Sequence, residues 1–263
     1  MRSKKLRQFT GPASPKKTPS SRSNSILVDS SVCAGCFYQS TCLAAELVNE
    51  LAKEGCPIHS NSQFLKAKYK VGEPLFRVST AFDALFMILS GSAKSSWLDE
   101  SGNEQIVGLY IPGDLVGLDA ISPGFHPSSA IILEESYVCR IPFYLFESGM
   151  TAAQRVKRTL IRQASRALRL EQFHSLSVRN KTADQRIAIF MSDLIRRLEN
   201  RSFASDRIVL SLSRRDIGNY LGLALGTVSR SFSRLQDAGV ITVHHREVVI
   251  HEAARLADLA GKG

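Results

Sequence analysis

Three cysteines lie within ten residues near the start of the chain, in the segment CAGCFYQSTC at 33–42. Two residues separate Cys33 from Cys36, and five more precede Cys42. Closely spaced thiolates are soft ligands for zinc and iron, and a Cys-x2-Cys pair also occurs at redox sites. The spacing is not that of a ferredoxin, so residue types alone leave zinc, an iron-sulfur cluster and thiol chemistry open.

The cysteine count of the whole chain argues against a disulfide framework. There are five cysteines in 263 residues, an odd number, and most lie near the start. The first residues hold no apolar segment followed by a small-residue cleavage site, and no apolar run is long enough to span a bilayer. We therefore expect a reducing, cytoplasmic environment without membrane association, and a globular core built from the 44% of residues that are hydrophobic.

The first 24 residues differ in composition from the rest of the chain. They contain seven Lys or Arg and no acidic residue, and they supply most of the net charge of +10. Ser and Pro are frequent and large apolar residues are rare, which predicts a disordered basic tail over 1–24. Such a tail can keep the protein in solution or attract nucleic acid weakly.

Residues 64–146 show the pattern of a β-structure. Short apolar runs such as LFMILSG and QIVGLYI alternate with turn motifs, among them SG at 90–91 and PGD at 112–114. Turns that recur at intervals of about ten residues are typical of an antiparallel roll or barrel. We expect this roll to form the body of a sensor domain over 25–150.

A long helix is expected over 151–179, because this stretch contains no Pro or Gly and its apolar residues recur at helical spacing. One stripe consists of Val156, Leu160, Ala167 and Leu170. A second, at heptad spacing, supplies the candidate dimer interface: Ile161, Ala164, Leu168, Glu171 and Ser175, followed by Val178. We predict a parallel homodimer through this helix, and the alternative is a helix that packs only within its own chain.

Glu171 is an unusual residue for such a seam. Across a two-fold axis it would bring two carboxylates near each other, and burying unpaired charges is costly. Either Glu171 turns out to solvent, or it makes the dimer conditional on another favourable interaction.

The C-terminal domain, expected over 180–263, contains two short helices joined by a tight turn. Ser213 is a suitable N-cap for the first, which runs through Tyr220, and Gly222 permits the turn. The second runs from about residue 225 to 238 and is ended by a glycine. Two helices joined in this way form a helix-turn-helix unit.

The residues around the second helix suit DNA better than a protein partner. Two short apolar runs, at 241–243 and 248–250, follow it and predict a two-stranded wing. The second helix of such a unit enters the major groove, where an arginine can bind O6 and N7 of guanine. The candidate DNA-binding residues are Thr227, Ser229 and Arg230 in its first turns, with Arg214, Arg215 and Arg234 beside them as phosphate ligands.

Taken in order, these parts resemble the Crp/Fnr superfamily of bacterial transcription regulators, and in particular its oxygen-sensing fumarate and nitrate reduction branch. The resemblance covers nearly everything after the basic tail and rests on the motifs PGDLVGLDAI, SYVCRIPF and DIGNYLGLALGTVSR. It implies an α+β fold with a β-roll like that of cyclic-nucleotide-binding domains, a dimerisation helix and a winged helix-turn-helix. It also implies a regulator and not an enzyme, and the sequence contains no phosphate loop, nucleophile elbow or metalloprotease pattern.

A cofactor and a mechanism follow from the same resemblance. The family binds a [4Fe-4S] cluster through three N-terminal cysteines and one in the roll, which correspond here to Cys33, Cys36, Cys42 and Cys139. Breakdown of the cluster in oxygen would loosen the homodimer and release its palindromic DNA site. An activator of this family also contacts RNA polymerase, and the segment LDESGNEQ at 98–105 is the candidate contact. By residue type alone Cys139 is typical of a buried core residue, and Cys56 is interpreted as a bystander or a substitute ligand.

The chain departs from the family at one DNA-reading position. A glutamate commonly stands three residues before the serine of the Ser229-Arg230 pair, where it can accept a hydrogen bond from cytosine. Here the residue is Gly226, so we expect the family's TTGAT half-site to be relaxed or changed.

Three rival interpretations remain open on the sequence. A cyclic-nucleotide regulator would need an arginine that segment 112–133 does not contain. A haem-binding regulator could use His126 and the thiols as axial ligands. A zinc-stabilised structural or interaction protein would use the same four cysteines.

Overall fold

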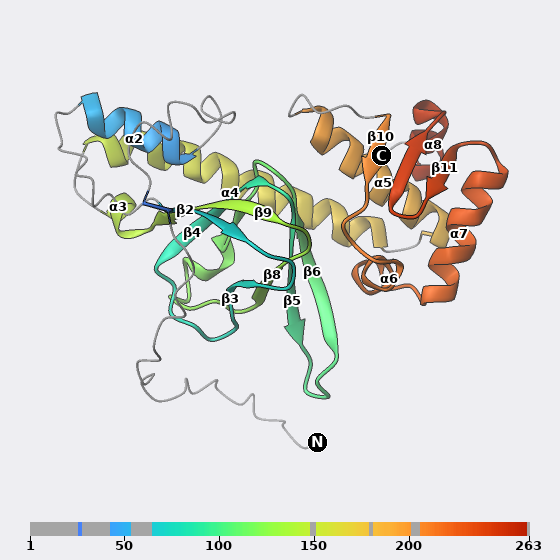
Figure 1. Ribbon diagram of the computed structural model, residues 1–263, viewed down its shortest axis with the longest axis horizontal. Coiled ribbons are helices and arrows are strands. Elements are labelled where there is room, and N and C mark those ends of the chain that lie inside the picture. Colours follow the sequence, from blue (N-terminus) through green and yellow to red (C-terminus); the bar gives the residue numbers. More distant parts are fainter. Residues whose placement is uncertain are drawn as a thin grey trace, which may run out of the picture.

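The computed structural model describes residues 26–27, 43–53, 65–147, 151–178, 181–200 and 206–261. The expected ligands Cys33, Cys36 and Cys42 lie outside these residues, as do Cys56 and the basic tail. A β-structure occupies one side of the molecule and a mainly helical domain the other, and the long helix α4, Thr151–Val178, runs from one to the other (Figure 1). None of the described helices is long and apolar enough to cross a membrane.

The β-structure is an antiparallel roll made of two sheets, as the turn spacing predicts. The first sheet has the order β1-β2-β9-β4-β7, with β1 Ile26–Leu27, β2 Leu65–Tyr69, β9 Ser136–Pro142, β4 Ala84–Ser90 and β7 Leu115–Val116. The second has the order β3-β8-β5-β6, with β3 Pro74–Phe76, β8 Ser129–Ile132, β5 Ala93–Leu98 and β6 Glu104–Tyr110. One buried cluster takes side chains from both sheets and fills the roll, among them Phe76, Phe86, Ile88, Ile132 and Val138.

The outer face of the first sheet is covered by helices. Successive side chains of a strand point to opposite faces, so Val138 of β9 packs inside the roll whereas Cys139 and Ile141 belong to a second buried cluster. That cluster, here called the outer cluster, also contains Leu43 and residues of α4. The covering helices are α2 Leu43–Lys53, α3 Tyr144–Glu147 and α4, and a short 3-10 helix, η1, spans Leu118–Ala120.

Polar contacts join α2 to the first half of α4. Thr159 Oγ1 donates a hydrogen bond to Glu46 Oε1 at 2.9 Å, and Arg155 Nε lies 2.5 Å from Glu50 Oε2. Val156, between these two positions of α4, is fully buried in the outer cluster. Helix α2 therefore holds α4 on the sheet through both apolar and polar contacts.

The C-terminal domain is built on α5, Ala183–Glu199, whose first turn is closed by a capping box of Thr182 and Gln185. Its remaining helices are α6 Arg214–Leu221, α7 Leu225–Asp237 and α8 Ala253–Ala260. Its sheet has the order β10-β12-β11, with β10 Arg207–Val209, β11 Ile241–His244 and β12 Glu247–Ile250. The expected wing is thus β11 and β12, to which β10 adds a third strand that is too short to be predicted from residue periodicity.

Two glycines in turns between strands, one where the chain passes between the two sheets and one in a hairpin, allow the cost of the backbone conformation to be compared with the cost of crowding. Gly91, between β4 and β5, has φ +80°, and a Cβ there would lie 2.0 Å from Ser136 Oγ and 2.7 Å from the Glu135 carbonyl oxygen. Gly102, between β5 and β6, has φ +79° and nothing within 4 Å of such a Cβ.

We therefore expect Gly102→Ala to lower the free energy of unfolding by about 1 kcal/mol, the cost of the left-handed conformation, and Gly91→Ala by roughly 3 kcal/mol or more. Urea denaturation followed by circular dichroism measures both. Equal effects of the two substitutions would contradict the crowding at Gly91.

Candidate functional site

The helix-turn-helix unit forms where the sequence places it. Ser213 Oγ accepts a hydrogen bond from the Asp216 backbone N–H at 3.1 Å, and Asp216 Oδ2 accepts one from the Ser213 backbone N–H, so α6 starts at a capping box. It ends at Gly222, whose φ of +64° is left-handed. At Gly218 a Cβ would lie 2.5 Å from the Leu223 carbonyl oxygen, and the missing side chain lets the turn close against α6.

The first turns of α7 present the three expected base-reading residues on the surface. Ser229 and Arg230 are exposed and Thr227 is partly buried. Ser229 Oγ donates to the Leu225 carbonyl oxygen at 3.1 Å, and Arg230 Nη2 donates to Thr227 Oγ1 at 3.3 Å. A Cβ at Gly226 would lie 3.4 Å from Arg230 Nη1, so this glycine lies directly beside the guanidinium group.

The three flanking arginines have different environments. Arg215 is exposed. Arg214 lies against Phe232, with its guanidinium carbon 3.3 Å from the ring centroid, and burial lowers the pKa of Arg214. Arg234 donates to both carboxylate oxygens of Asp184 on α5, at 2.8 and 2.5 Å, and these hydrogen bonds lower the pKa of Asp184. As the structure stands, Arg215 is the most accessible phosphate ligand of the three.

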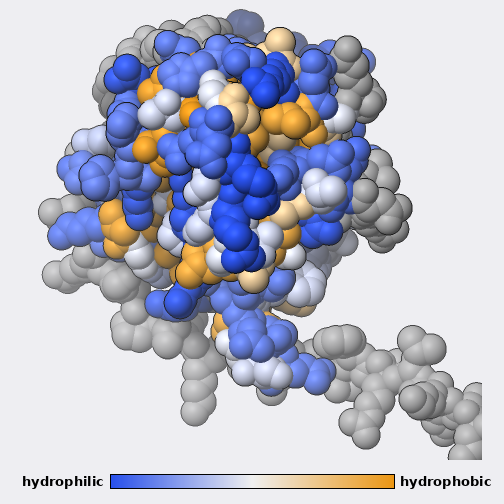
Figure 2. Space-filling view, turned by 90° about the vertical axis from the view of Figure 1, so that its right-hand side faces the viewer, coloured by the Kyte–Doolittle hydropathy of each residue, from blue (hydrophilic) through white to orange (hydrophobic). Residues whose placement is uncertain are grey.

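This end of the molecule carries a mainly polar surface with smaller apolar patches (Figure 2). Figure 2 looks directly at it and shows a band of strongly hydrophilic residues across the middle of the face. The turn of the wing, with His244, His245 and Arg246, is exposed, and His245 adopts a positive φ of 56°. The reading helix and the wing thus both present polar side chains outward, as a DNA-binding surface requires.

The expected thiol of the roll, Cys139, is buried in the outer cluster. In the first sheet, Cys139 of β9 is opposite Lys66 of β2, and Lys66 is opposite Ile26 of β1. Since neighbouring strands lie about 4.8 Å apart, the Ile26 backbone is roughly 10 Å from that of Cys139. At the other side, α2 begins at Leu43, directly after Cys42, and Leu43 is in the same buried cluster as Cys139.

The segment that carries the three N-terminal cysteines is thus flanked by one residue roughly 10 Å from Cys139 and by another in the same buried cluster as Cys139. From Leu27 to Cys33 the chain has six residues, which can span up to about 20 Å. Within the described ranges, no three His, Cys, Asp or Glu side chains gather as a metal site, and three of the four expected ligands are outside those ranges.

His126, the residue considered for haem, is 2% exposed and lies inside the roll. Its ring stacks on Phe76 at a centroid distance of 3.6 Å and meets the edge of Phe82 at 5.7 Å. Burial lowers the pKa of His126 and favours the neutral ring. The imidazole is thus packed between aromatic rings, a position that suits a core residue.

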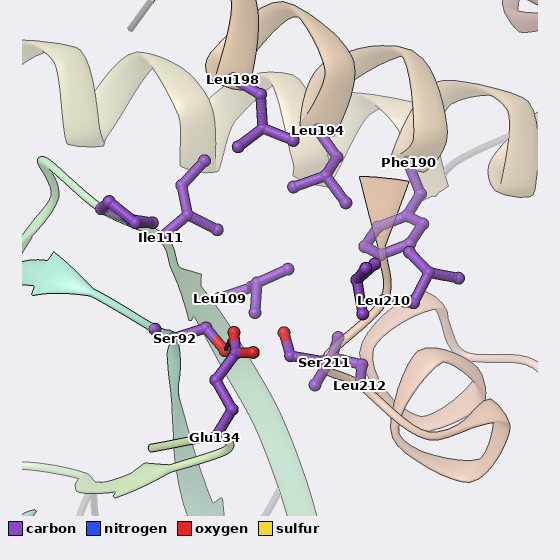
Figure 3. A pocket seen from close by; sticks show the side chains of 13 residues that line it. Ser92, Leu109, Ile111, Glu134, Phe190, Leu194, Leu198, Leu210, Ser211 and Leu212 are labelled. Atoms are coloured by element: carbon purple, nitrogen blue, oxygen red, sulfur yellow. Dashed lines mark hydrogen bonds between the residues drawn. The ribbon is translucent and has the colours of Figure 1, made fainter. Parts of the chain in front are cut away.

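Contacts between the roll and the C-terminal domain involve residues that no sequence pattern indicates. Arg197 of α5 pairs with Asp114 at 2.5 Å and donates to the Leu109 carbonyl oxygen at 2.9 Å. Beside these contacts lies a cavity of about 170 Å³ (Figure 3). Side chains of both domains line it, among them Leu109, Ile111, Phe190, Leu194 and Leu212, and Glu134 lies at its polar end, where it accepts a hydrogen bond from Ser92.

Comparisons with known proteins match both parts of the chain. Residues 66–151 match the family model of the cyclic nucleotide-binding domain, and residues 185–259 match that of the Crp-like helix-turn-helix domain. The chain is 38% identical over 236 residues to the transcriptional activator protein Anr of Pseudomonas protegens, with 87% of this chain and 92% of Anr covered.

Two further relatives agree with this result. The fumarate and nitrate reduction regulatory protein of Escherichia coli is 38% identical over 196 residues, which cover 74% of this chain and 78% of that protein. The structure of FixK2 from Bradyrhizobium japonicum superposes with a TM-score of 0.69 and 29% identity, covering 76% of this chain and 98% of FixK2. The fold, the helix-turn-helix and these relatives together show that the chain belongs to the Crp/Fnr family of DNA-binding transcription regulators, and is not an enzyme.

Proposed function

We propose that this regulator responds to oxygen through a [4Fe-4S] cluster held by Cys33, Cys36, Cys42 and Cys139, and that it acts in the cytoplasm on genes for low-oxygen metabolism. The relatives named for fumarate and nitrate reduction support this reading at the level of the family. The observation that carries it in this chain is the position of Cys139. Its thiol lies on the sheet face that α2 covers, and both ends of the cysteine segment are anchored beside it.

The residues present fit such a group. Four thiolates are the usual ligands of a [4Fe-4S] cluster, and the described one is buried among apolar side chains, which limits access of water. When bound, the cluster would supply an oxygen-labile crosslink between the N-terminal segment and the roll. The same donor set would also suit zinc, so metal content decides between a sensor and a structural site.

The chain itself provides a path from the cysteines to the long helix. Cys42 is followed at once by α2, and α2 contacts α4 through the Glu46–Thr159 hydrogen bond and the Glu50–Arg155 ion pair. A ligand set that fixes Cys42 beside Cys139 would therefore fix the position of α2 on α4. We infer that this is how the state of the cysteines reaches the helix that pairs with a second chain.

The exposed stripe of α4 supports a homodimer. Val156 and Leu160 of the other stripe are buried within the chain, whereas Ile161 and Leu168 are 68% and 60% exposed. These two residues are one heptad apart, as the seam of a parallel helix pair requires, and Ala164 between them is partly buried within its own chain. In such a dimer the two α7 helices could enter successive major grooves of a palindromic site, about 34 Å apart.

Glu171 lies in line with this stripe and is exposed in the single chain. Nearby protein atoms nevertheless desolvate its carboxylate, which raises the pKa of Glu171, while Arg197 acts in the opposite direction. At neutral pH two such carboxylates would repel each other across the dimer axis. The dimer would then need the additional stabilisation that the intact N-terminal region provides.

The hairpin between β5 and β6 is the proposed contact for RNA polymerase. Its tip is organised by Asp99, which accepts hydrogen bonds from the backbone N–H groups of Ser101 and Asn103 at 2.9 and 2.8 Å. Leu98 beside it is 68% exposed. A preformed, exposed turn of this kind can contact a protein partner at little cost in conformational entropy.

Metal content and oligomeric state of Cys139→Ser test the ligand set, with Cys56→Ser as the matched control. Purified without oxygen, the wild type and Cys56→Ser should each carry about four iron and four sulfide per chain and should lose them with dimer formation in air. Cys139→Ser should lose iron and stay monomeric. Zinc in the wild type would overturn the oxygen sensor, and full iron retention by Cys139→Ser would overturn the ligand assignment.

Glu171→Ala tests the repulsion across the dimer axis. In air, without cluster, we expect it to dimerise roughly tenfold more tightly than the wild type, with a smaller difference at high salt because salt screens charge. Gln172→Ala, the neighbouring exposed residue, should behave like the wild type. Analytical ultracentrifugation gives the dissociation constants, and an unchanged constant for Glu171→Ala would disprove the repulsion.

Gly226→Glu tests the altered half-site. A glutamate at this exposed first turn of α7 would meet Arg230 at ordinary contact distance and should add a preference of about 1 to 3 kcal/mol for one C·G pair. Gly226→Ala should stabilise α7 by about 1 kcal/mol without changing the base preference. In vitro site selection compares the three proteins, and the interpretation fails if the wild type already selects that base pair as strongly as Gly226→Glu does.

A further inference from the structure

The outer edge of strand β6 is paired with a side chain of the helix-turn-helix unit. β6 is the last strand of the second sheet, so the backbone groups on its free side have no strand partner. Asn219 of α6 fills this place: its Oδ1 accepts from the Ile106 N–H at 2.6 Å, and its Nδ2 donates to the Glu104 carbonyl oxygen at 2.5 Å. The carboxamide thus pairs with β6 as the peptide group of a further strand would.

Few side chains can make this pair of contacts. A carboxamide offers an acceptor oxygen and a donor NH2 group in a single plane, whereas a carboxylate offers only acceptors and a hydroxyl is too short to reach both groups. An aspartate at 219 would keep the bond to Ile106 and place a negative oxygen against the Glu104 carbonyl oxygen. The contact therefore depends on the acceptor and the donor of the asparagine carboxamide, and not only on the size of the side chain.

Adjacent contacts align the same face of α6 with the hairpin. Gln105 Nε2 donates to the Asn219 carbonyl oxygen at 3.0 Å. Three residues earlier on the helix, Asp216 accepts from Lys94 of β5 at 2.9 Å, and Lys94 also contacts Glu104 at 3.1 Å. The Lys94 side chain is only 12% exposed, so this ion pair is well shielded from water.

The angle of the reading helix depends on this contact. α7 packs on α6 through buried Ile217, Leu221, Val228 and Phe232, so the two helices move as one unit. The apolar contact between roll and C-terminal domain contains the cavity of Figure 3, and apolar contact is in any case non-directional. The directional contacts among the described residues include those of Asn219, those of Lys94, and those of Arg197 with Asp114 and the Leu109 carbonyl oxygen.

We propose that Asn219 is a positioning residue that fixes the orientation of the DNA-reading unit relative to the roll and α4. It makes no base contact; it acts through the orientation of α7. The inference rests on the proposed dimer, because in a dimer the orientation of each unit sets the distance between the two reading helices.

Hydrogen exchange tests the contact without DNA. In the anaerobically prepared protein, the Ile106 amide should exchange roughly tenfold faster in Asn219→Ala than in the wild type. The Trp97 and Gln105 pair within the hairpin should keep its protection. Asn49→Ala, an exposed carboxamide on α2 at the other end of the molecule (Figure 1), is the control. Unchanged exchange at Ile106 in Asn219→Ala overturns the proposal, whereas Asn219→Asp, which keeps an acceptor for the Ile106 N–H, should exchange at nearly the wild-type rate.

DNA spacing then separates positioning from stability. The wild type should bind the palindrome it selects in vitro roughly tenfold more tightly than duplexes whose half-sites are moved by one or two base pairs. Asn219→Ala and Asn219→Asp should lose most of that preference while binding a single half-site as well as the wild type and Asn49→Ala do. A purely structural residue would weaken binding to all duplexes alike.

Retention of the spacing preference despite faster exchange would overturn the positioning role. If the wild type bound no palindrome at all, the proposed function would fail and positioning on DNA with it. The exchange measurement would still show whether Asn219 holds the two domains together.

Discussion

The structure depends on helix α4, which the other described residues cover on one side only. α4 buries Val156 and Leu160 against the first sheet and α2, while Ile161 and Leu168 remain exposed. Burial of each such side chain is worth about 1.5 to 3 kcal/mol, which supports the proposal that a second copy covers this stripe. Helix α2, which directly follows Cys42, packs against the opposite, buried stripe of α4.

Where the two domains meet, apolar contacts provide stability and polar contacts fix the orientation. Leu109 and Ile111 of the roll share a core with α5. The apolar area that they bury stabilises the contact between the domains but does not fix their relative orientation, because apolar contact is non-directional. Asn219 and Arg197 make hydrogen bonds, whose energy falls steeply with angle. Such a joint can be stable and still have a defined orientation, which a regulator needs if a change at one end is to alter the distance between reading helices at the other.

The DNA-reading end holds its cations in place before DNA is present. Arg230 lies along the first turn of α7 on Thr227, and Arg234 is held by Asp184. A side chain that is already ordered loses less conformational entropy on binding. If Arg234 binds phosphate, it must release Asp184 to do so, and its contribution to affinity would be the difference between two ion pairs. Gly226 leaves the guanidinium of Arg230 without the neighbouring carboxylate that is common in the family.

The sequence by itself determined the features that depend on neighbouring residues. The absence of Pro and Gly predicts α4, and the turns recurring about every ten residues predict the roll. Ser213 and Gly222 set the ends of α6, because capping and left-handed turns are local. The thiol spacing at 33–42 left zinc, an iron-sulfur cluster and thiol chemistry open.

Only the tertiary structure decided which distant groups meet. Asn219 and Ile106 are 113 residues apart, and Arg234 reaches Asp184 across 50 residues. Contacts of this kind produce no periodic or local pattern in the sequence. The residues around each partner predict its own helix or strand, but not which distant residue it will contact. The burial of one α4 stripe and the exposure of the other were decided in the same way, because two apolar stripes look alike until a sheet covers one of them.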